Sequence, residues 1–181
     1  MPESPDTLVA ETERLLLRHL TPDDAPFILE LLNERSFLEN IGDRGVRSLE
    51  DARQYIRNGP MASYARHGFG LFLVTLKTTG ESAGICGLLR REVMEDVDIG
   101  FAFLPRFWSK GYAVESATEM MRLSRDRFGI PRVVAVTAPH NEASARVLEK
   151  IGLHFERRLD LPDFGPDRKL FTPDGAGQKP A

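Results

Sequence analysis

The sequence is poor in the features that mark disulfide-rich, membrane-spanning and nucleic-acid-binding proteins. Its one cysteine, Cys86, excludes a disulfide within the chain and is typical of a reducing compartment. No uncharged apolar run approaches the roughly 20 residues that span a bilayer, and residues 1–6 lack the pattern of a signal peptide. The formal net charge of -3 gives the chain as a whole no basic surface for nucleic acid. We therefore expect a cytoplasmic protein without a membrane partner or direct nucleic-acid contact.

The chain does contain enough apolar sequence for one core. Hydrophobic residues make up 41% and charged residues 28% of the 181 residues, which is the balance of a single globular domain. We place this domain at residues 1–171. Residues 172–181 are rich in proline and glycine and nearly lack apolar side chains, so they are predicted to form a disordered tail.

Cys86 lies within an apolar run at residues 83–89. A small buried hydrophobe and a catalytic nucleophile are both compatible with that setting. The four histidines show none of the spacings of a metal site, so no metal is expected.

Helical and strand patterns alternate along the chain. Caps and apolar spacing predict helices that begin at Pro22, Leu49, Ala113 and Glu142. Short apolar runs predict strands at 14–18, 69–77, 83–90, 97–104, 132–136 and 153–159. Connections between residues 69 and 104 are too short for crossovers and predict an antiparallel meander, whereas the strand–helix–strand finish predicts one parallel pairing. The fold class is therefore α/β or α+β, with a mixed sheet.

A strand ends near Leu104 and a helix begins near Ala113, with Gly111 between them. Free backbone N–H groups at a helix start form an anion site, and glycine lets a ligand approach the backbone closely. Lys110 and Arg106 add positive charge. The segment favours a diphosphate ligand, although a glycine used only for packing gives the same pattern.

Two segments match a known family. Residues 108–113 read Trp-Ser-Lys-Gly-Tyr-Ala and resemble the coenzyme A pyrophosphate loop of GNAT acetyltransferases, usually Gln/Arg-x-x-Gly-x-Gly/Ala. They are more similar still to the ribosomal-protein N-terminal acetyltransferase branch, whose loop reads Tyr-Trp-Gly-Lys-Gly-Tyr-Ala-x-Glu-Ala. Residues 141–153 resemble that branch's Asn-x-x-Ser-x-x-Val-Leu-Glu-Lys-x-Gly-Phe. With the opening at residues 13–20, the resemblance covers roughly residues 13–159.

The resemblance implies a fold and a ligand. The fold is the GNAT fold, a mixed central sheet of about seven strands flanked by about four helices, and the ligand is acetyl-coenzyme A. It implies that the backbone N–H near Phe103 polarises the thioester carbonyl on a strand edge that pairs with pantetheine. The cofactor-binding residues carried over are Phe101, Phe103, Leu104, Trp108, Ser109, Lys110, Gly111, Tyr112, Ala113, Asn141 and Ser144. Trp108 stands where the wider family has Gln or Arg, and Ser109 replaces the first glycine of the branch.

Two residues are predicted to be catalytic. Asp98 occupies the position where the branch often has Glu, and we predict that it accepts the amine proton through a water molecule. An ordinary solvent-facing strand carboxylate is the alternative. Many family members have a tyrosine acid where this chain has Leu148, so Ser144 is the remaining group to hydrogen-bond or protonate the sulfur.

The expected activity is transfer of an acetyl group to a primary amine, by direct attack in a ternary complex. A protein N-terminal α-amine of the ribosomal-protein type is the first candidate acceptor. A small-molecule amine and a non-catalytic acyl-coenzyme A sensor are the alternatives. The acceptor is expected to be selected by residues 37–47, by the helix that begins at Leu49 and by residues 163–171. A monomer and a homodimer are both compatible with the sequence.

Overall fold

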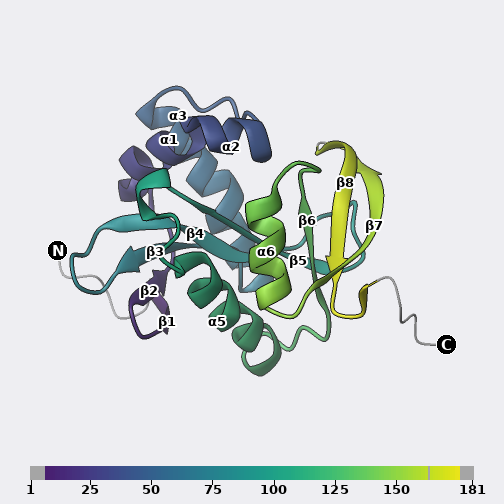
Figure 1. Cartoon of the computed structure of the whole chain (residues 1–181). Coiled ribbons are helices and arrows are strands. Elements are labelled where there is room, and N and C mark those ends of the chain that lie inside the picture. The colour runs from purple at the N-terminus through teal and green to yellow at the C-terminus, as the bar shows by residue number, and fades with distance from the viewer. Residues whose placement is uncertain (1–6, 163, 176–181) are drawn as a thin grey trace.

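The computed structural model describes residues 7–162 and 164–175, which contain one mixed sheet of eight strands in the order β1-β2-β3-β4-β5-β6-β8-β7 (Figure 1). The strands are β1 (Leu8–Glu11), β2 (Leu15–Arg18), β3 (Leu71–Leu76), β4 (Ser82–Leu89), β5 (Val97–Phe103), β6 (Val133–Thr137), β7 (His154–Leu161) and β8 (Gly165–Thr172). This is the α/β class with a mixed sheet that the sequence predicts.

Of the four predicted helices, three begin within one residue of their predicted starts, and the helix predicted at Pro22 begins as a 3₁₀ turn, Pro22–Asp24. The α-helices are α1 (Ala25–Asn33), α2 (Arg35–Asn40), α3 (Leu49–Ile56), α4 (Ala62–His67), α5 (Tyr112–Asp126) and α6 (Glu142–Lys150). Asp24 accepts the backbone N–H of Thr21 at 2.9 Å ahead of α1. Ser48 accepts the N–H of Asp51 at 3.1 Å, which satisfies a free donor of the first turn of α3.

Strand pairing confirms both topological predictions. β3, β4 and β5 form an antiparallel meander. β5 and β6 pair in parallel, with α5 as the connection between them, but the pairing covers only Val97 with Val133 and Asp98 with Val134. Beyond these two pairs the strands part, so the sheet is open along the second half of β5.

The two faces of the sheet carry different helices. α5 packs over β4 and β5, and α6 packs over β6, as the two green helices of Figure 1 show. Cys86 of β4 points to this side, where its neighbour is Ser116 of α5. Cys86 is fully buried, and burial raises the pKa of its thiol to about 12, which disfavours a nucleophilic thiolate. The opposite face lies beneath α2 and α3.

The structure adds elements that the sequence patterns do not reveal. It has eight strands, whereas the resemblance implies about seven and the apolar runs predict six; β1 and β8 are the two strands that the runs do not predict. β1 has four residues, and β8 contains proline and charged residues and buries only its last three residues, so neither shows apolar alternation. The helices α2 and α4 were also missed, since each has only six residues. β8 ends at Thr172, one residue beyond the predicted domain boundary, while residues 176–181 of the predicted tail lie outside the described residues.

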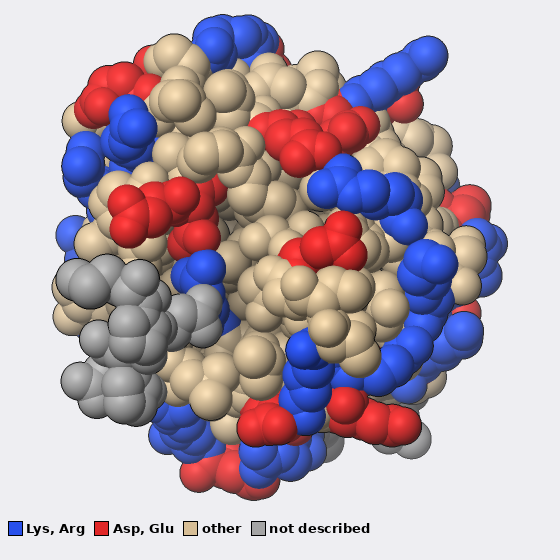
Figure 2. Space-filling model, turned by 90° about the vertical axis from the view of Figure 1, so that its left-hand side faces the viewer, with Lys and Arg blue, Asp and Glu red and all other residues tan. Residues whose placement is uncertain are grey.

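Basic and acidic side chains are interspersed on the face of the molecule that Figure 2 shows. This distribution matches the small formal net charge of -3. Within residues 7–162 and 164–175, no helix is long and apolar enough to cross a membrane.

Candidate active site

The predicted pyrophosphate loop has a backbone shape that only a few residue types adopt easily. Ser109 has φ 59° and Gly111 has φ 83°, both in the left-handed region, and α5 begins at the next residue, Tyr112. This shape directs successive backbone N–H groups at the start of α5 to one side, as an anion site requires. It also explains the family's glycine at the position of Ser109, because glycine adopts positive φ without steric cost.

Side chains from the turn between β1 and β2 hold this loop in place. The Arg14 guanidinium donates to the Lys110 carbonyl at 2.8 Å and pairs with Glu115 at 2.7 Å. Glu115 also accepts from Thr12 at 2.7 Å. Burial alone would raise the pKa of the Glu115 carboxyl, but these hydrogen bonds outweigh burial and hold the pKa below its usual value. Glu115 therefore stays ionised and fixes Arg14 against the loop.

A cleft of about 630 Å³ lies beside the loop, between α5, α6 and the open edge of β5. We call it the donor cleft. Of the predicted cofactor-binding residues, nine line it: Phe101, Phe103, Trp108, Ser109, Gly111, Tyr112, Ala113, Asn141 and Ser144. Two do not. Lys110 is exposed outside the cleft, and Leu104 is fully buried in the core.

The open edge of β5 presents backbone polar groups to the donor cleft. Leu104 donates its N–H to Ala83, on the β4 side. Because successive residues of a strand direct their N–H groups to opposite sides, the N–H and carbonyl of Phe103 face the gap between β5 and β6. The Trp108 indole donates to that Phe103 carbonyl at 2.8 Å. The geometry therefore fits the expected backbone role of Phe103.

Ser144 is oriented by the cap of α6. The Asn141 side chain accepts the N–H of Ser144 at 3.1 Å and donates its amide to the Ser144 hydroxyl at 2.9 Å. Since the Ser144 oxygen is already an acceptor, its own proton is available to another group. Leu148, in the family's tyrosine position, is buried and carries no proton to donate.

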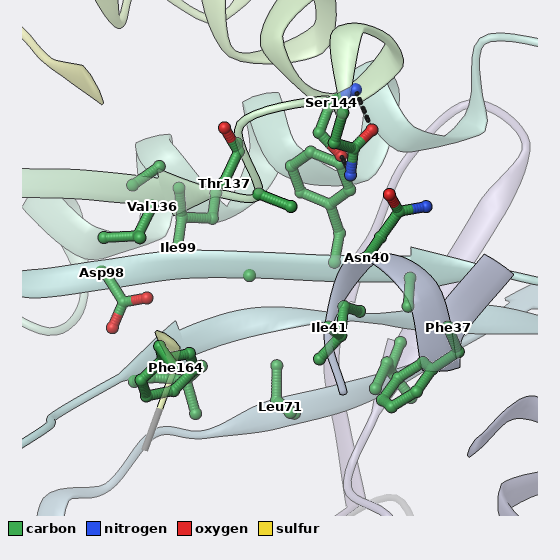
Figure 3. A pocket seen from close by; sticks show the side chains of 18 of the residues that line it. Phe37, Asn40, Ile41, Leu71, Asp98, Ile99, Val136, Thr137, Ser144 and Phe164 are labelled. Atoms are coloured by element: carbon green, nitrogen blue, oxygen red, sulfur yellow. Dashed lines mark hydrogen bonds between the residues drawn. The ribbon is translucent and has the colours of Figure 1, made fainter. Parts of the chain in front are cut away.

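A second cavity, of about 290 Å³, lies on the sheet face beneath α2 and α3. We call it the acceptor pocket, and Figure 3 shows it from close by. It shares seven residues with the donor cleft: Phe37, Asn40, Ile41, Phe101, Ala102, Asn141 and Ser144. The two cavities therefore meet where β5 and β6 have parted. Gly100 has no side chain to occupy the pocket. A Cβ at this position would lie 3.3 Å from the side chain of Leu89, which also lines the pocket.

Asp98 lies in the acceptor pocket and is 2% exposed, so the solvent-facing alternative is wrong. Arg91 donates to its carboxylate at 2.9 Å. Burial raises the pKa of the Asp98 carboxyl, and Arg91 opposes this only in part. Figure 3 shows Asp98 beside Phe164 and at the opposite end of the pocket from Ser144.

The three segments expected to select the acceptor do meet at this pocket. Residues 37–44 provide one side, Tyr55 of α3 a second, and Phe164 and Arg168 a third. Several lining residues carry no sequence motif and were not singled out individually: Arg44, Tyr55, Arg91, Thr137, Phe164 and Arg168.

Comparison with known proteins defines the class. Residues 14–154 match the acetyltransferase (GNAT) domain family, so the chain belongs to the GNAT acetyltransferases, which transfer acetyl groups from acetyl-coenzyme A. Among its relatives, YkkB of Bacillus subtilis is 28% identical over 151 residues, covering 82% of this chain and 86% of YkkB. YoaA of the same organism, described as an uncharacterized N-acetyltransferase, is 27% identical over 149 residues, covering 82% and 84%.

Solved structures confirm the fold. An acetyltransferase from Agrobacterium tumefaciens superimposes with a TM-score of 0.76 at 24% identity, over 90% of this chain and 92% of that one. RimL, a ribosomal L7/L12 α-N-protein acetyltransferase solved in complex with coenzyme A, gives a TM-score of 0.78 at 19% identity, over 94% and 99%. At these identities the likeness extends to the fold alone.

Proposed function

We propose that this protein acetylates a primary amine by direct attack on acetyl-coenzyme A, with both substrates bound at once. The observation that carries the proposal is the junction of the two cavities at Phe101, Ala102, Asn141 and Ser144. A thioester in the donor cleft and an amine in the acceptor pocket come into contact there while both substrates remain bound. Holding the reactants together in this way removes much of the entropic barrier to the reaction.

The donor is bound mainly by backbone groups. The N-terminus of α5 and the loop around Gly111 receive the diphosphate. The gap between β5 and β6 receives the pantetheine arm, and the N–H of Phe103 polarises the thioester carbonyl. This order along the cleft brings the thioester to the junction with the acceptor pocket.

In the reaction, the amine nitrogen forms a bond to the carbonyl carbon, and the bond from that carbon to sulfur breaks. The proton that the nitrogen loses passes to Asp98. Asp98 lies three residues before Phe101, a separation of about 10 Å along an extended strand, so the proton crosses ordered water. Ser144 donates a hydrogen bond to the departing thiolate sulfur and keeps its proton, and the proton held by Asp98 passes back through water to the thiolate, which restores the Asp98 carboxylate.

Two acceptors fit this mechanism. The first is a protein N-terminal α-amine, supported by the resemblance of residues 108–113 and 141–153 to the ribosomal-protein branch. The second is a small-molecule amine. The small volume of the acceptor pocket, about 290 Å³, favours the second.

The test has two stages. Calorimetric titration with acetyl-coenzyme A is expected to give micromolar binding, and release of free thiol with a panel of primary amines is expected to show turnover. A Ser144→Ala variant is expected to lose about tenfold in kcat while binding the donor normally, and Ser144→Thr should retain most activity. Donor binding without turnover on any amine or peptide would mean a sensor, and no donor binding would overturn the proposal.

A further inference from the structure

Three arginines line the acceptor pocket, and two of them lie over one aromatic ring. The guanidinium carbon of Arg91 lies 3.9 Å from the centre of the Phe164 ring, and that of Arg44 lies 5.7 Å from it. Arg168 follows Phe164 in the same β7–β8 hairpin. All three arginines line the pocket. Nothing in the proposed transfer of an acetyl group to an amine requires this cluster.

The positive charge of the cluster is only partly neutralised. Asp98 is the one carboxylate among the described residues that line the pocket, and it pairs with Arg91. Three guanidinium groups and one carboxylate leave a formal charge of +2. Within residues 7–162 and 164–175, neither Arg44 nor Arg168 has a carboxylate partner. Asp163 lies outside this range.

Two polar atoms of the pocket wall are buried without a hydrogen-bond partner in the described part of the chain. They are Nε of Arg168 and the hydroxyl of Thr137, a residue that is only 7% exposed. Buried polar groups in folded proteins nearly always have partners, so such groups in a cavity wall indicate where a ligand supplies the partner. A guanidinium N–H requires an acceptor, and carboxylate oxygens suit it best.

The arginine cluster and the transfer point lie at opposite ends of the pocket. Figure 3 shows Phe164 beside Asp98, and Ser144 at the other end. Along β5, the step from Asp98 to the shared wall at Phe101 is three residues, or about 10 Å. A ligand that fills the pocket therefore presents one end to the thioester and the other end to the arginines.

We propose that the acceptor is a small amine with a carboxylate at the end remote from the amine, bound by Arg44 and Arg168. This inference rests on the proposed function, because it identifies the acceptor of that same reaction. The charge disfavours a basic peptide terminus. Among acidic acceptors, the volume of about 290 Å³ favours a small molecule over a chain.

The experiment uses a series of straight-chain amino acids with a terminal amine, from glycine to 6-aminohexanoate. Each is compared with its primary amide, which has the same length but no negative charge. Thiol release is measured for the full-length protein at saturating acetyl-coenzyme A. We expect at least one of the longer acids to exceed its amide tenfold or more in kcat/KM, because the carboxylate is bound in a largely desolvated site.

Variants connect this preference to the cluster. Arg168→Gln is expected to reduce the preference for acid over amide at least tenfold while acetyl-coenzyme A affinity stays unchanged. Arg157→Gln is the matched control, since Arg157 is exposed on the neighbouring strand β7 and lines neither cavity. A thermal melt verifies that both variants fold.

The outcomes separate the inference from the proposed function. Equal rates for acids and amides, or an unchanged preference in Arg168→Gln, overturn the inference and leave amine acetylation standing. A peptide with an N-terminal aspartate that reacts faster than every small acid overturns the small-molecule acceptor.

If no amine reacts, the proposal of amine acetylation fails, and the arginine cluster is then tested by calorimetry. Binding of hexanoate but not hexanamide, lost in Arg168→Gln, then supports the anion site, and equal or absent binding overturns it.

Discussion

The donor cleft and the acceptor pocket share a wall but are built in different ways. At the donor cleft, the groups expected to bind the ligand are backbone groups of three continuous segments, namely the loop before α5, the open edge of β5 and the start of α6, and residues of α1 and α2 complete the wall. The acceptor pocket is lined by residues from α2, α3, α6, β3, β4, β5, β6 and β8 and from the loops beside them. A backbone site is insensitive to most substitutions but depends on local conformation, whereas a side-chain site changes with each residue that lines it.

The electrostatics of the two sites differ in the same way. At the donor cleft, the dipole of α5 and its free N–H groups supply a positive potential that favours an anion and does not change with pH. At the acceptor pocket, the field comes from arginines and from Asp98, whose charge depends on pH. Perturbing backbone conformation should therefore affect the donor, and perturbing charge should affect the acceptor and the chemistry.

The largest effect is expected from a bulky side chain at Gly111. Gly111→Trp should weaken acetyl-coenzyme A binding by about 100-fold or more, because a Cβ at this positive-φ position lies 3.2 Å from the Arg14 guanidinium, so the bulky side chain displaces Arg14 and distorts the anion site at the helix N-terminus. Gly129→Trp is the control, since Gly129 also has positive φ, at 63°, but has open space around it and lies beyond the far end of α5. Calorimetry of both variants checks this. Equal loss in both would mean that a bulky residue at positive φ destabilises the whole protein, and that distortion of the anion site is not responsible.

Asp98→Asn should lower kcat/KM by about 100-fold with little change in donor affinity. The pH profile gives the sign of the effect. Because burial raises the pKa of Asp98, the carboxylate forms only above that raised pKa, and the rate should rise as pH increases through it. This acidic limb should lie above the ordinary value of about 3.9 and disappear in the variant.

A control for Asp98 is Asp96→Asn, because Asp96 pairs with Arg132 away from both cavities. A retained acidic limb in Asp98→Asn would show that Asp98 positions Arg91 and does not accept the proton.

A smaller effect is expected when the support of the donor loop is removed. Glu115→Gln should raise the KM for acetyl-coenzyme A by about threefold to tenfold, with kcat and the acceptor preference unchanged, because Arg14 loses its ionic partner. Glu119→Gln, which loses a surface pair with Arg122 one turn further along α5, should change neither constant. A change in kcat in Glu115→Gln would contradict a purely positioning role.

The smallest effect is expected at Ser109. Relief of its left-handed conformation by glycine is worth about 1–2 kcal/mol, and the added freedom of the unfolded chain takes back about 0.4–1 kcal/mol. Ser109→Gly should therefore stabilise the protein by about 0–1.6 kcal/mol. Ser109→Val should destabilise it, because β-branched residues rarely adopt positive φ. Chemical denaturation measures both. Destabilisation in Ser109→Gly would indicate that the serine side chain stabilises the loop.

The predictability of the two sites follows from how they are built. The turn at Gly111, the cap at Asn141 and the position of Ser144 depend on neighbours in the sequence, so short motifs identify them. The sequence also indicated three segments that come together around the acceptor pocket. It did not reveal the arginine cluster, because Arg44, Arg91 and Arg168 are far apart in the chain and meet only through the sheet. Arg168 lies in β8, whose charged, proline-containing sequence hides the strand. Nor did it reveal that Asp98 is buried, because the helices that cover its face come from residues 35–56.

The short parallel seam between β5 and β6 has a mechanical consequence. Two residue pairs, Val97 with Val133 and Asp98 with Val134, join the first five strands to the last three. The sheet therefore consists of two parts, β1–β5 and β6–β8, that are joined by this short pairing. Both cavities lie along the opening where β5 and β6 diverge. Few backbone hydrogen bonds between β5 and β6 oppose a change in the angle between these two parts of the sheet. We therefore expect a molecule bound in the opening to contact both parts of the sheet and to restrict this angle, which would stabilise the folded domain.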